Sequence, residues 1–285
     1  MSSPVLDPEL LKAFVAVADQ RSFTRAAVML NRTQSAVSMQ IKRLEDRLGV
    51  ALFSRTTVNV DLSAAGEGLL GYARRILMLN NEAVGRLRDH KVEGVVRLGV
   101  MDDYGSIVVP PLLARFVSGY PLIHVEMETG LTATMANRLG ESFDLVIAMH
   151  PQGRGDGEFL RREQAVWAAG ASHPVEAMDP LPVALYPHGC LFRKWATEAL
   201  DNAGRPWRLA FVSHSLAAVE AIVAQGLAVT VVKSGTFPSK LRVLSERDGM
   251  PELPAADICL HRATNLSHAA SLLADHLVLA ISQPA

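Results

Sequence analysis

Residues 22–49 read SFTRAAVMLNRTQSAVSMQIKRLEDRLG, and this stretch predicts two helices joined by a tight turn. Ser22 and Thr33 are residue types that cap the first turn of a helix, and Gly49 suits the left-handed position that ends one. Asn31-Arg32 forms the break. In the second helix, apolar residues recur at the period of a helix packed on one face: Val37, Ile41, Leu44 and Leu48.

The opposite face of the second helix carries an ordered set of side chains: Gln34, Ser35, Ser38, Met39, Lys42 and Arg43. Short uncharged groups come first and basic groups follow, an order suited to a helix whose first turns enter the major groove of DNA. The uncharged groups would reach base edges, while the helix N-terminus and the cations would hold phosphates. The alternative is a solvated helix in a small bundle.

The flanking segments complete a small DNA-binding fold. Asp7-Pro8 predicts the start of a preceding helix, which makes three helices. After Gly49, the alternating run Val58–Leu62 predicts a β-hairpin, or wing. Arg55 lies where a wing could meet the DNA backbone or minor groove; equally, it could pair with Asp61 or Glu45 on the surface.

Ser63 predicts the cap of a long helix that runs to about Lys91. Apolar and small residues are spaced alternately three and four apart, as in a coiled-coil seam with Asn80 as its polar member: Gly66, Leu69, Ala73, Ile76, Asn80, Ala83 and Leu87. An intramolecular helix pair is the alternative, but the sequence suggests no neighbouring helix. We therefore predict a homodimer through this helix.

Beyond Gly94 the pattern changes to short apolar strands separated by helical stretches, which predicts parallel sheets covered by helices. The expected fold class is α/β: a winged helix-turn-helix at 1–62, a linker helix at 63–93, and a domain of two small α/β lobes at 94–285. The first lobe covers about 94–150 and 263–285, and the second about 151–262.

Composition fits two functional parts. The chain has 285 residues and a net charge of −1, but residues 1–92 hold 13 Lys and Arg against nine Asp and Glu, a net of +4. A basic N-terminal segment on an acidic body suits a DNA-binding module attached to a domain with a different role. The two cysteines imply no disulfide framework or metal site, and we find no signal peptide or membrane span. We expect a cytoplasmic protein with no membrane partner and no cofactor besides a small-molecule effector.

The sensor cleft should lie beyond the carboxyl ends of strands. Four places qualify, and they supply these candidate effector-binding residues: Asp102, Asp103, Tyr104 and Ser106; Thr129, Gly130, Leu131 and Thr132; Ser213 and His214; and His150. Two adjacent carboxylates would repel an anion, so we expect a cationic, neutral or hydroxylated effector as readily as a carboxylate. Alternatively, Asp103 caps the following helix, Asp102 is solvated, and His214 is a hydrogen-bonded structural residue.

Two long stretches resemble a known family. The run AFVAVADQRSFTRAAVMLNRTQSAVSMQIKRLEDRLGVALFSRT at 13–56, followed by LSAAGEGLL at 62–70, resembles the N-terminal signature of LysR-type transcriptional regulators. The C-terminal part is similar to that family's effector-binding domain, which implies the two-lobed fold of periplasmic substrate-binding proteins (type 2) at 94–285. Two further segments, Pro206–Ala210 and Leu241–Ser245, resemble the LrhA/HexA branch.

The resemblance implies a set of roles at matching positions. Gln34, Ser35 and Ser38 match positions that approach bases, Ser22 and Thr24 match phosphate contacts, and Arg55 matches the wing arginine. Met39 departs from the basic or polar residue often found there, so one phosphate contact fewer is expected. The implied partners are double-stranded DNA and further copies of the chain in a homotetramer with antiparallel linker helices, with RNA polymerase as a third candidate.

Three functions compete at this stage. A ligand-responsive transcriptional regulator explains both halves of the chain. A solute-binding protein explains only the two lobes. An enzyme would need one of the two nucleophile–base neighbours, Cys190 with His188 or Ser215 with His214, and neither lies in a catalytic signature. We therefore predict a regulator and no enzyme.

Overall fold

The computed structural model describes residues 5–55, 60–88, 92–171 and 174–282. The chain forms two compact units, built mainly from Met1–Lys91 and from Val92–Val117 with Pro121–Ile281. Among the described residues, no helix is both long enough and apolar enough to cross a membrane.

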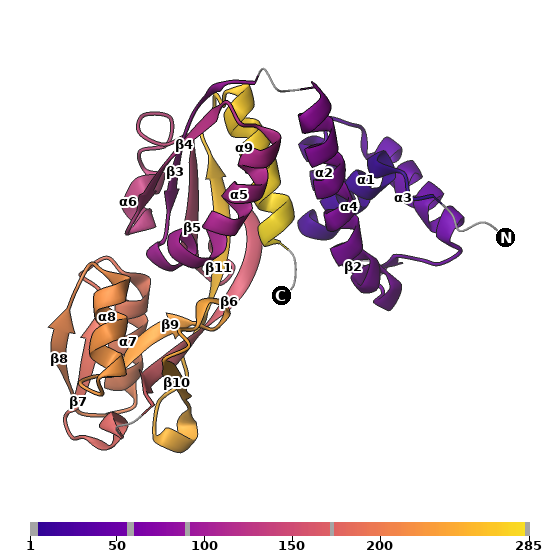
Figure 1. Cartoon of the computed structure of the whole chain (residues 1–285). Helices are drawn as coiled ribbons and strands as arrows, with labels where there is room; N and C mark the ends of the chain where they lie inside the picture. Colours follow the sequence, from indigo (N-terminus) through magenta and orange to yellow (C-terminus); the bar gives the residue numbers. More distant parts are fainter. Residues whose placement is uncertain (1–4, 56–59, 89–91, 172–173, 283–285) are drawn as a thin grey trace. The chain divides into compact units, whose positions relative to one another are not determined.

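The first unit begins with three helices, α1 (Pro8–Gln20), α2 (Phe23–Met29) and α3 (Gln34–Leu48) (Figure 1). Each begins, as predicted, where a side-chain oxygen accepts a backbone N–H: Asp7 from Glu9, Ser22 from Arg25, and Thr33 from Ala36. Gly49 ends α3 with a left-handed φ of 70°. Val37, Ile41 and Leu44 are fully buried, so the predicted stripe is the packed face.

A short hairpin follows, with β1 (Phe53–Arg55) antiparallel to β2 (Val60–Leu62). The Phe53 ring lies 5.5 Å from that of Phe14 and 5.8 Å from that of Phe23, which anchors the hairpin on the helices. Residues 56–59 and the side chain of Arg55 lie outside the described residues.

The long helix α4 runs from Ala64 to Arg88, and the Ser63 hydroxyl accepts the N–H of Gly66 as predicted. We expected no helical neighbour within the chain, and this is wrong for the first half of the helix. α1 packs against α4, and the seam residues Gly66 and Ala73 are buried. Further along the helix, side chains are exposed to solvent: Leu79 is 58% exposed, and Asn80 is also exposed.

The second unit contains a seven-stranded sheet in the order β10-β6-β11-β5-β3-β4, with β9 also paired to β6. In the first lobe, β3 (Gly94–Val100) is parallel to β4 (Ile123–Thr129) and β5 (Leu145–Pro151). β11 (Ala255–Arg262) is antiparallel to β5 and to the start of β6 (Glu158–Gly170). The first lobe also contains three helices: α5 (Val109–Gly119), α6 (Thr132–Ala136) and α9 (His268–Ile281).

β6 is long enough to belong to both lobes. Its second half pairs with β9 (Thr230–Lys233) and β10 (Leu241–Leu244). The second lobe adds a parallel pair, β7 (Leu181–Leu185) and β8 (Trp207–Val212), with helices α7 (Leu191–Asn202) and α8 (Leu216–Ala224) (Figure 1). The expected α/β fold with two lobes joined by a crossing strand is confirmed.

Some predicted elements differ from the structure. The stretch from Thr132 to Gly140 predicts a helix, but α6 ends at Ala136. No strand is expected from the sequence at 241–244, where β10 forms. Within the described residues there are also a π-helical turn, η1 (Tyr104–Val108), and three 3-10 turns, η2 (Val175–Ala177), η3 (Ser234–Thr236) and η4 (Glu246–Asp248).

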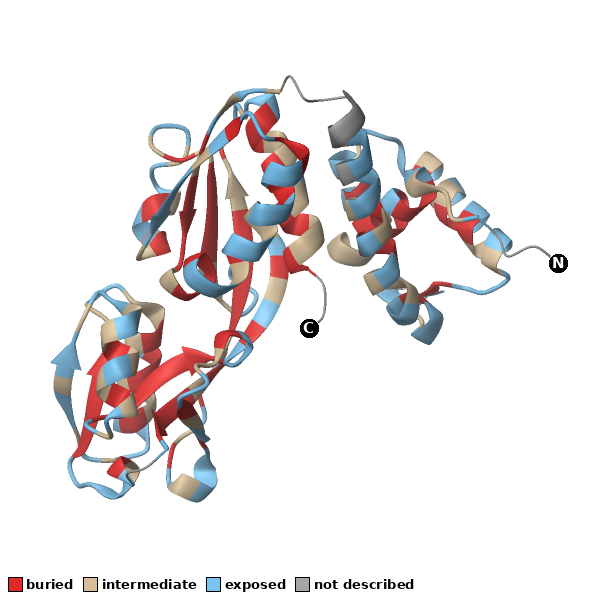
Figure 2. Ribbon diagram, viewed as in Figure 1, coloured by how far each residue is buried: buried red, intermediate tan, exposed pale blue. Residues whose placement is uncertain are grey.

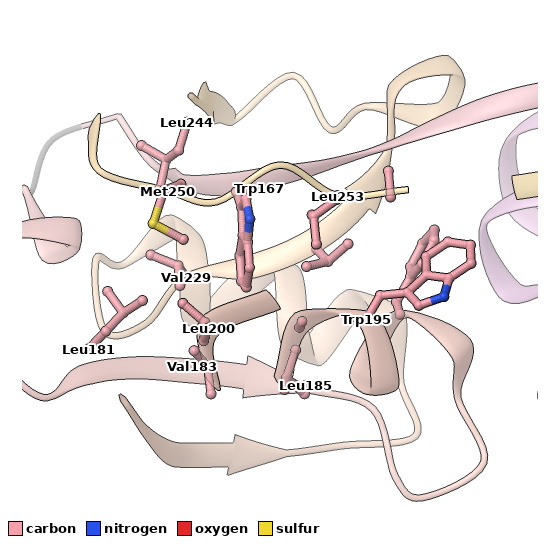
Figure 3. Close-up of a cluster of buried hydrophobic side chains, with 14 of the residues drawn as sticks. Trp167, Leu181, Val183, Leu185, Trp195, Leu200, Val229, Leu244, Met250 and Leu253 are labelled. Atoms are coloured by element: carbon pink, nitrogen blue, oxygen red, sulfur yellow. The ribbon is translucent and has the colours of Figure 1, made fainter. Parts of the chain in front are cut away.

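Burial follows the sheet, with β3, β5 and β9 largely buried and the outer helix faces exposed (Figure 2). Trp167 stands at the centre of the second-lobe core, among Leu181, Leu200 and Val229 (Figure 3). Its indole N–H donates to the Pro251 carbonyl at 2.9 Å, so its polar atom is satisfied inside the core. This core fixes β6 beside β9 and thereby sets the position of Lys233.

Candidate functional site

The outward face of α3 presents the side chains that the sequence singled out. Gln34, Ser35, Met39, Lys42 and Arg43 are exposed, and Met39 reaches 70%. Among the described residues, neither Lys42 nor Arg43 makes an ion pair, so both cations are available to phosphate.

Small polar side chains at the start of α3 form hydrogen bonds with one another. The Gln34 amide donates to the Ser38 hydroxyl at 3.0 Å, and the Thr33 and Ser35 hydroxyls lie 3.1 Å apart. These bonds pre-orient side chains of the first two turns. Ser22 is engaged as the cap of α2, whereas Thr24, in its first turn, is exposed.

Both carboxylates that could pair with Arg55 have other partners. Glu45 accepts the backbone N–H of Leu52 at 2.8 Å, and Asp61 lies 3.9 Å from a guanidinium nitrogen of Arg21. This hydrogen bond connects α3 to the start of the wing.

A cleft lies between the two lobes of the second unit. Five of the predicted effector-binding residues line it: Asp102, Asp103, Gly130, Leu131 and Thr132. Most of the other lining side chains are apolar, and they come from the ends of strands and the start of α7 and α8: Met101, Met149, Leu191, Phe192, Leu216, Val231 and Val232.

Six predicted residues lie elsewhere. Tyr104 begins η1 and is fully buried outside the cleft lining, where its hydroxyl donates to Glu163 at 3.0 Å. The hydroxyls of Ser106 and Ser213 bond backbone groups, of Asp102 and Ser215 respectively. Thr129 and His214 are exposed outside the lining, and His150 contacts His261 instead.

The sequence interpretation missed several polar lining residues: Tyr186, Cys190, Glu220, Lys233 and Thr236. Tyr186 and Lys233 stand at the ends of β7 and β9, where the rule used for the first lobe would have placed them. Glu220 projects from α8 and has no comparable signal in the sequence.

Asp103 does not cap the following helix, which corrects one sequence-based alternative. Its carboxylate accepts from Lys233 Nζ at 2.6 Å and from the Thr236 hydroxyl at 2.7 Å. The Lys233 ammonium also lies over the rings of Tyr104 and Phe192, at 5.6 and 5.1 Å from their centroids. Lysine therefore neutralises one of the two adjacent carboxylates.

Two carboxylates in the cleft, Asp102 and Glu220, have no ion-pair partner among the described residues. Burial, and then the charge of Asp103, raise the pKa of the Glu220 carboxyl above its ordinary value. Burial also raises the pKa of the Tyr186 hydroxyl, and neighbouring carboxylates, Asp103 foremost, add to the rise. The polar part of the cleft is thus acidic, and it favours donors and cations over anions.

The residues considered for catalysis are engaged differently. A guanidinium nitrogen of Arg193 lies 3.2 Å from the His188 ring, and burial raises the pKa of the Cys190 thiol, which disfavours the reactive thiolate. The Ser215 hydroxyl accepts the N–H of Ala218 as the cap of α8.

Comparison with known families adds independent findings. Residues 8–67 match the family described as "Bacterial regulatory helix-turn-helix protein, lysR family", and residues 89–280 match the "LysR substrate binding domain". The chain is 37% identical over 274 residues to the transcriptional regulator DgdR of Burkholderia cepacia, covering 95% of this chain and 93% of that protein.

The chain is also 36% identical over 256 residues to the transcriptional regulator PecT of Dickeya dadantii. The match covers 89% of this chain and 81% of PecT. Among solved structures, CrgA of Neisseria meningitidis, described as a LysR-type transcriptional regulator, superposes with a TM-score of 0.62. That likeness covers 96% of this chain and 98% of CrgA at 22% identity, so it concerns the fold alone.

Proposed function

This chain belongs to the LysR family of helix-turn-helix transcriptional regulators, and from this premise we propose which of its residues recognise DNA and effector. It is a DNA-binding transcriptional regulator with an effector-binding domain, which sets aside a solute-binding protein without a transcriptional role.

We propose that α3 enters the major groove. Gln34, Ser35 and Ser38 read base edges, and Lys42 and Arg43 hold the backbone on either side. Ser22, Thr24 and Thr33 contact phosphate at the starts of α2 and α3, Met39 packs at the groove edge, and Arg55 contacts DNA from the wing. The observation that carries this proposal is the outward face of α3, where Gln34 is exposed and where Lys42 and Arg43 are exposed and make no ion pair among the described residues.

The cleft between the lobes is the proposed effector site. Of the eleven positions inferred from the sequence, we retain those that line the cleft, and we add Tyr186, Glu220, Lys233 and Thr236. The mostly apolar wall with an acidic polar end fits an effector with an apolar body and a donor or cationic group.

We propose boundaries at 1–62 for the winged helix-turn-helix, 63–93 for the linker helix and 94–285 for the effector domain. Copies of the chain pair through the second half of α4, where Leu79 and Asn80 are exposed, and two pairs form a tetramer. Two recognition helices are needed because one buries too little surface to select a genomic site. The narrower LrhA/HexA-like assignment, contact with RNA polymerase and the cytoplasmic location remain predictions.

The proposed mechanism couples the cleft to DNA. An effector that prefers one angle between the lobes shifts the tetramer toward that state, by no more than its difference in affinity for the two states. Scattering curves that stay unchanged when a proven effector saturates the protein would count against this mechanism.

The most direct test maps the DNA bound by the protein across its genome and measures gel shifts on the enriched fragments. We expect sequence-specific binding by the purified protein, and genes near the bound sites whose products act on the effector's chemical class. Equal affinity for enriched and scrambled fragments would refute the recognition role of α3.

A further inference from the structure

One connection in the effector domain crosses over a strand at close range. β11 lies between β5 and β6 in the sheet, so residues 152–157, which join β5 to β6, must pass over β11. Glycines allow the close approach. A Cβ at Gly155 would lie 2.6 Å from Cys259 Sγ, and one at Gly157 would lie 2.8 Å from the Leu260 carbonyl.

This crossing brings together three side chains that are far apart in the sequence. His150 comes from the end of β5, His261 from β11, and Asp156 from the crossing segment itself. The Nε2 atoms of the two histidines lie 2.8 Å apart, and His261 Nδ1 lies 3.7 Å from Asp156 Oδ1. One ligand atom from each of the three residues lies within 4.8 Å of the others.

We propose that His150, His261 and Asp156 form a binding site for a divalent transition-metal ion of the Zn²⁺ type. Two imidazole nitrogens and a carboxylate oxygen are donors that Zn²⁺, Co²⁺ and Ni²⁺ accept, whereas Mg²⁺ and Ca²⁺ prefer all-oxygen sets. Three protein ligands leave at least one position for water.

The distances require little rearrangement. Nitrogens bound to one tetrahedral ion at about 2.1 Å are separated by roughly 3.4 Å, so the two rings need to part by about half an ångström. A hydrogen bond between the rings also explains a separation of 2.8 Å, but it does not require a carboxylate beside them. Asp156 can turn to the ion because its side chain is 88% exposed, while His261 is shielded at 11%.

Because of its position, a metal ion bound at this site would cross-link separate segments of the sheet. A bound ion would link β5, β11 and the segment that leads into β6, the strand that continues from the first lobe into the second. The site is separate from the effector cleft, whose lining includes none of the three residues. Metal binding and effector binding can therefore be tested independently.

The test uses the untagged full-length chain, freed of metal by chelation and then titrated with Zn²⁺, with Co²⁺ for its absorption spectrum and Mg²⁺ as a control. We expect one Zn²⁺ per chain, a Co²⁺ spectrum typical of nitrogen and oxygen ligands, a rise in the unfolding temperature, and no response to Mg²⁺.

Three variants identify the ligands: His150→Gln, His261→Gln and Asp156→Asn. Each should weaken Zn²⁺ binding at least tenfold, while His214→Gln, an exposed histidine outside the cluster, should bind as the wild type does. Asp156 lies on an exposed segment, so its substitution keeps the test valid where a histidine variant fails to fold. Absence of Zn²⁺ binding in the titration, or unchanged affinity in any of the three variants, overturns the assignment.

Discussion

Lys233 reaches across the effector cleft to Asp103, with Nζ 2.6 Å from Oδ2. Lys233 ends β9 in the second lobe, and Asp103 follows β3 in the first, so the pair joins the two lobes directly. Both side chains are nearly enclosed, at 5% and 10% exposure. Removing two charges from water is costly, and here the cost is offset by mutual attraction and by the Thr236 hydroxyl.

Replacing only the cation should destabilise the effector domain. Lys233→Met leaves the Asp103 carboxylate buried without a counter-ion, which typically costs about 3–5 kcal/mol. Thermal unfolding followed by circular dichroism measures the loss, with Lys240→Met as the matched control because Lys240 is exposed. The double variant Lys233→Met with Asp103→Leu should recover part of the loss. Equal unfolding temperatures for Lys233→Met and Lys240→Met would mean that the pair contributes nothing to the fold.

The unpaired carboxylates should set the charge preference of the cleft. Asp102→Asn removes one negative charge, and for a ligand charge about 7 Å away this is worth roughly 2 kcal/mol at an effective dielectric constant of 20. We expect the variant to bind carboxylate probes more tightly, and amine probes of matched shape less tightly, than the wild type. Ligand-induced shifts in unfolding temperature across paired amines and carboxylates provide the measurement. An Asp102→Asn variant with the wild-type order of preference would show that Asp102 stays solvated.

The helix-turn-helix domain could be predicted from the sequence because the residues that determine its helix ends and its buried face act locally. Ser22, Thr33 and Gly49 act within four residues of their own positions, and the buried stripe of α3 follows directly from its period. The same locality explains why the wing could be predicted in outline.

The cleft could be predicted only in part, because it depends on contacts distant in sequence. Asp103 meets Lys233 across 130 positions, and Glu163 receives the Tyr104 hydroxyl across 59. Nothing near Asp103 in the chain distinguishes a buried ion pair from a helix cap. The packing of α1 on α4 could not be predicted for the same reason, because α2, α3 and the hairpin lie between the two helices in the sequence.

The second half of α4 should carry the dimer contact. Leu79 is 58% exposed on this helix, and a glutamate there would bring a charge into a helix–helix interface. We expect Leu79→Glu to weaken dimerisation at least tenfold, measured by analytical ultracentrifugation over a range of concentrations. Leu122→Glu, at a leucine 52% exposed in the effector domain, is the matched control and should leave assembly unchanged. A wild-type dimerisation constant for Leu79→Glu would place the interface elsewhere.

Lys42 should contribute affinity without sequence preference. Lys42→Ala removes a phosphate contact, so binding should weaken on all DNA sequences and the slope of log K against log salt should fall by about one. Anisotropy titrations at several salt concentrations measure this slope. Lys12, exposed on α1 rather than α3, supplies the control Lys12→Ala, which should keep the wild-type slope. A loss confined to one DNA sequence would instead make Lys42 a base-reading residue.

Gln34 should behave in the opposite way, because its role is to read a base. In the free protein its amide donates to Ser38 at 3.0 Å, which holds the side chain ready at the first turn of α3. Gln34→Ala should cost about 1–3 kcal/mol on the preferred site and relax selection at a single base pair. The salt slope should stay unchanged, since no phosphate contact is lost. Selection from a randomised DNA pool measures the preference at each position for wild type and variant side by side. If base preference survives intact in Gln34→Ala while affinity falls equally on every sequence, Gln34 contacts the backbone, and Ser35 and Ser38 are left to read the bases.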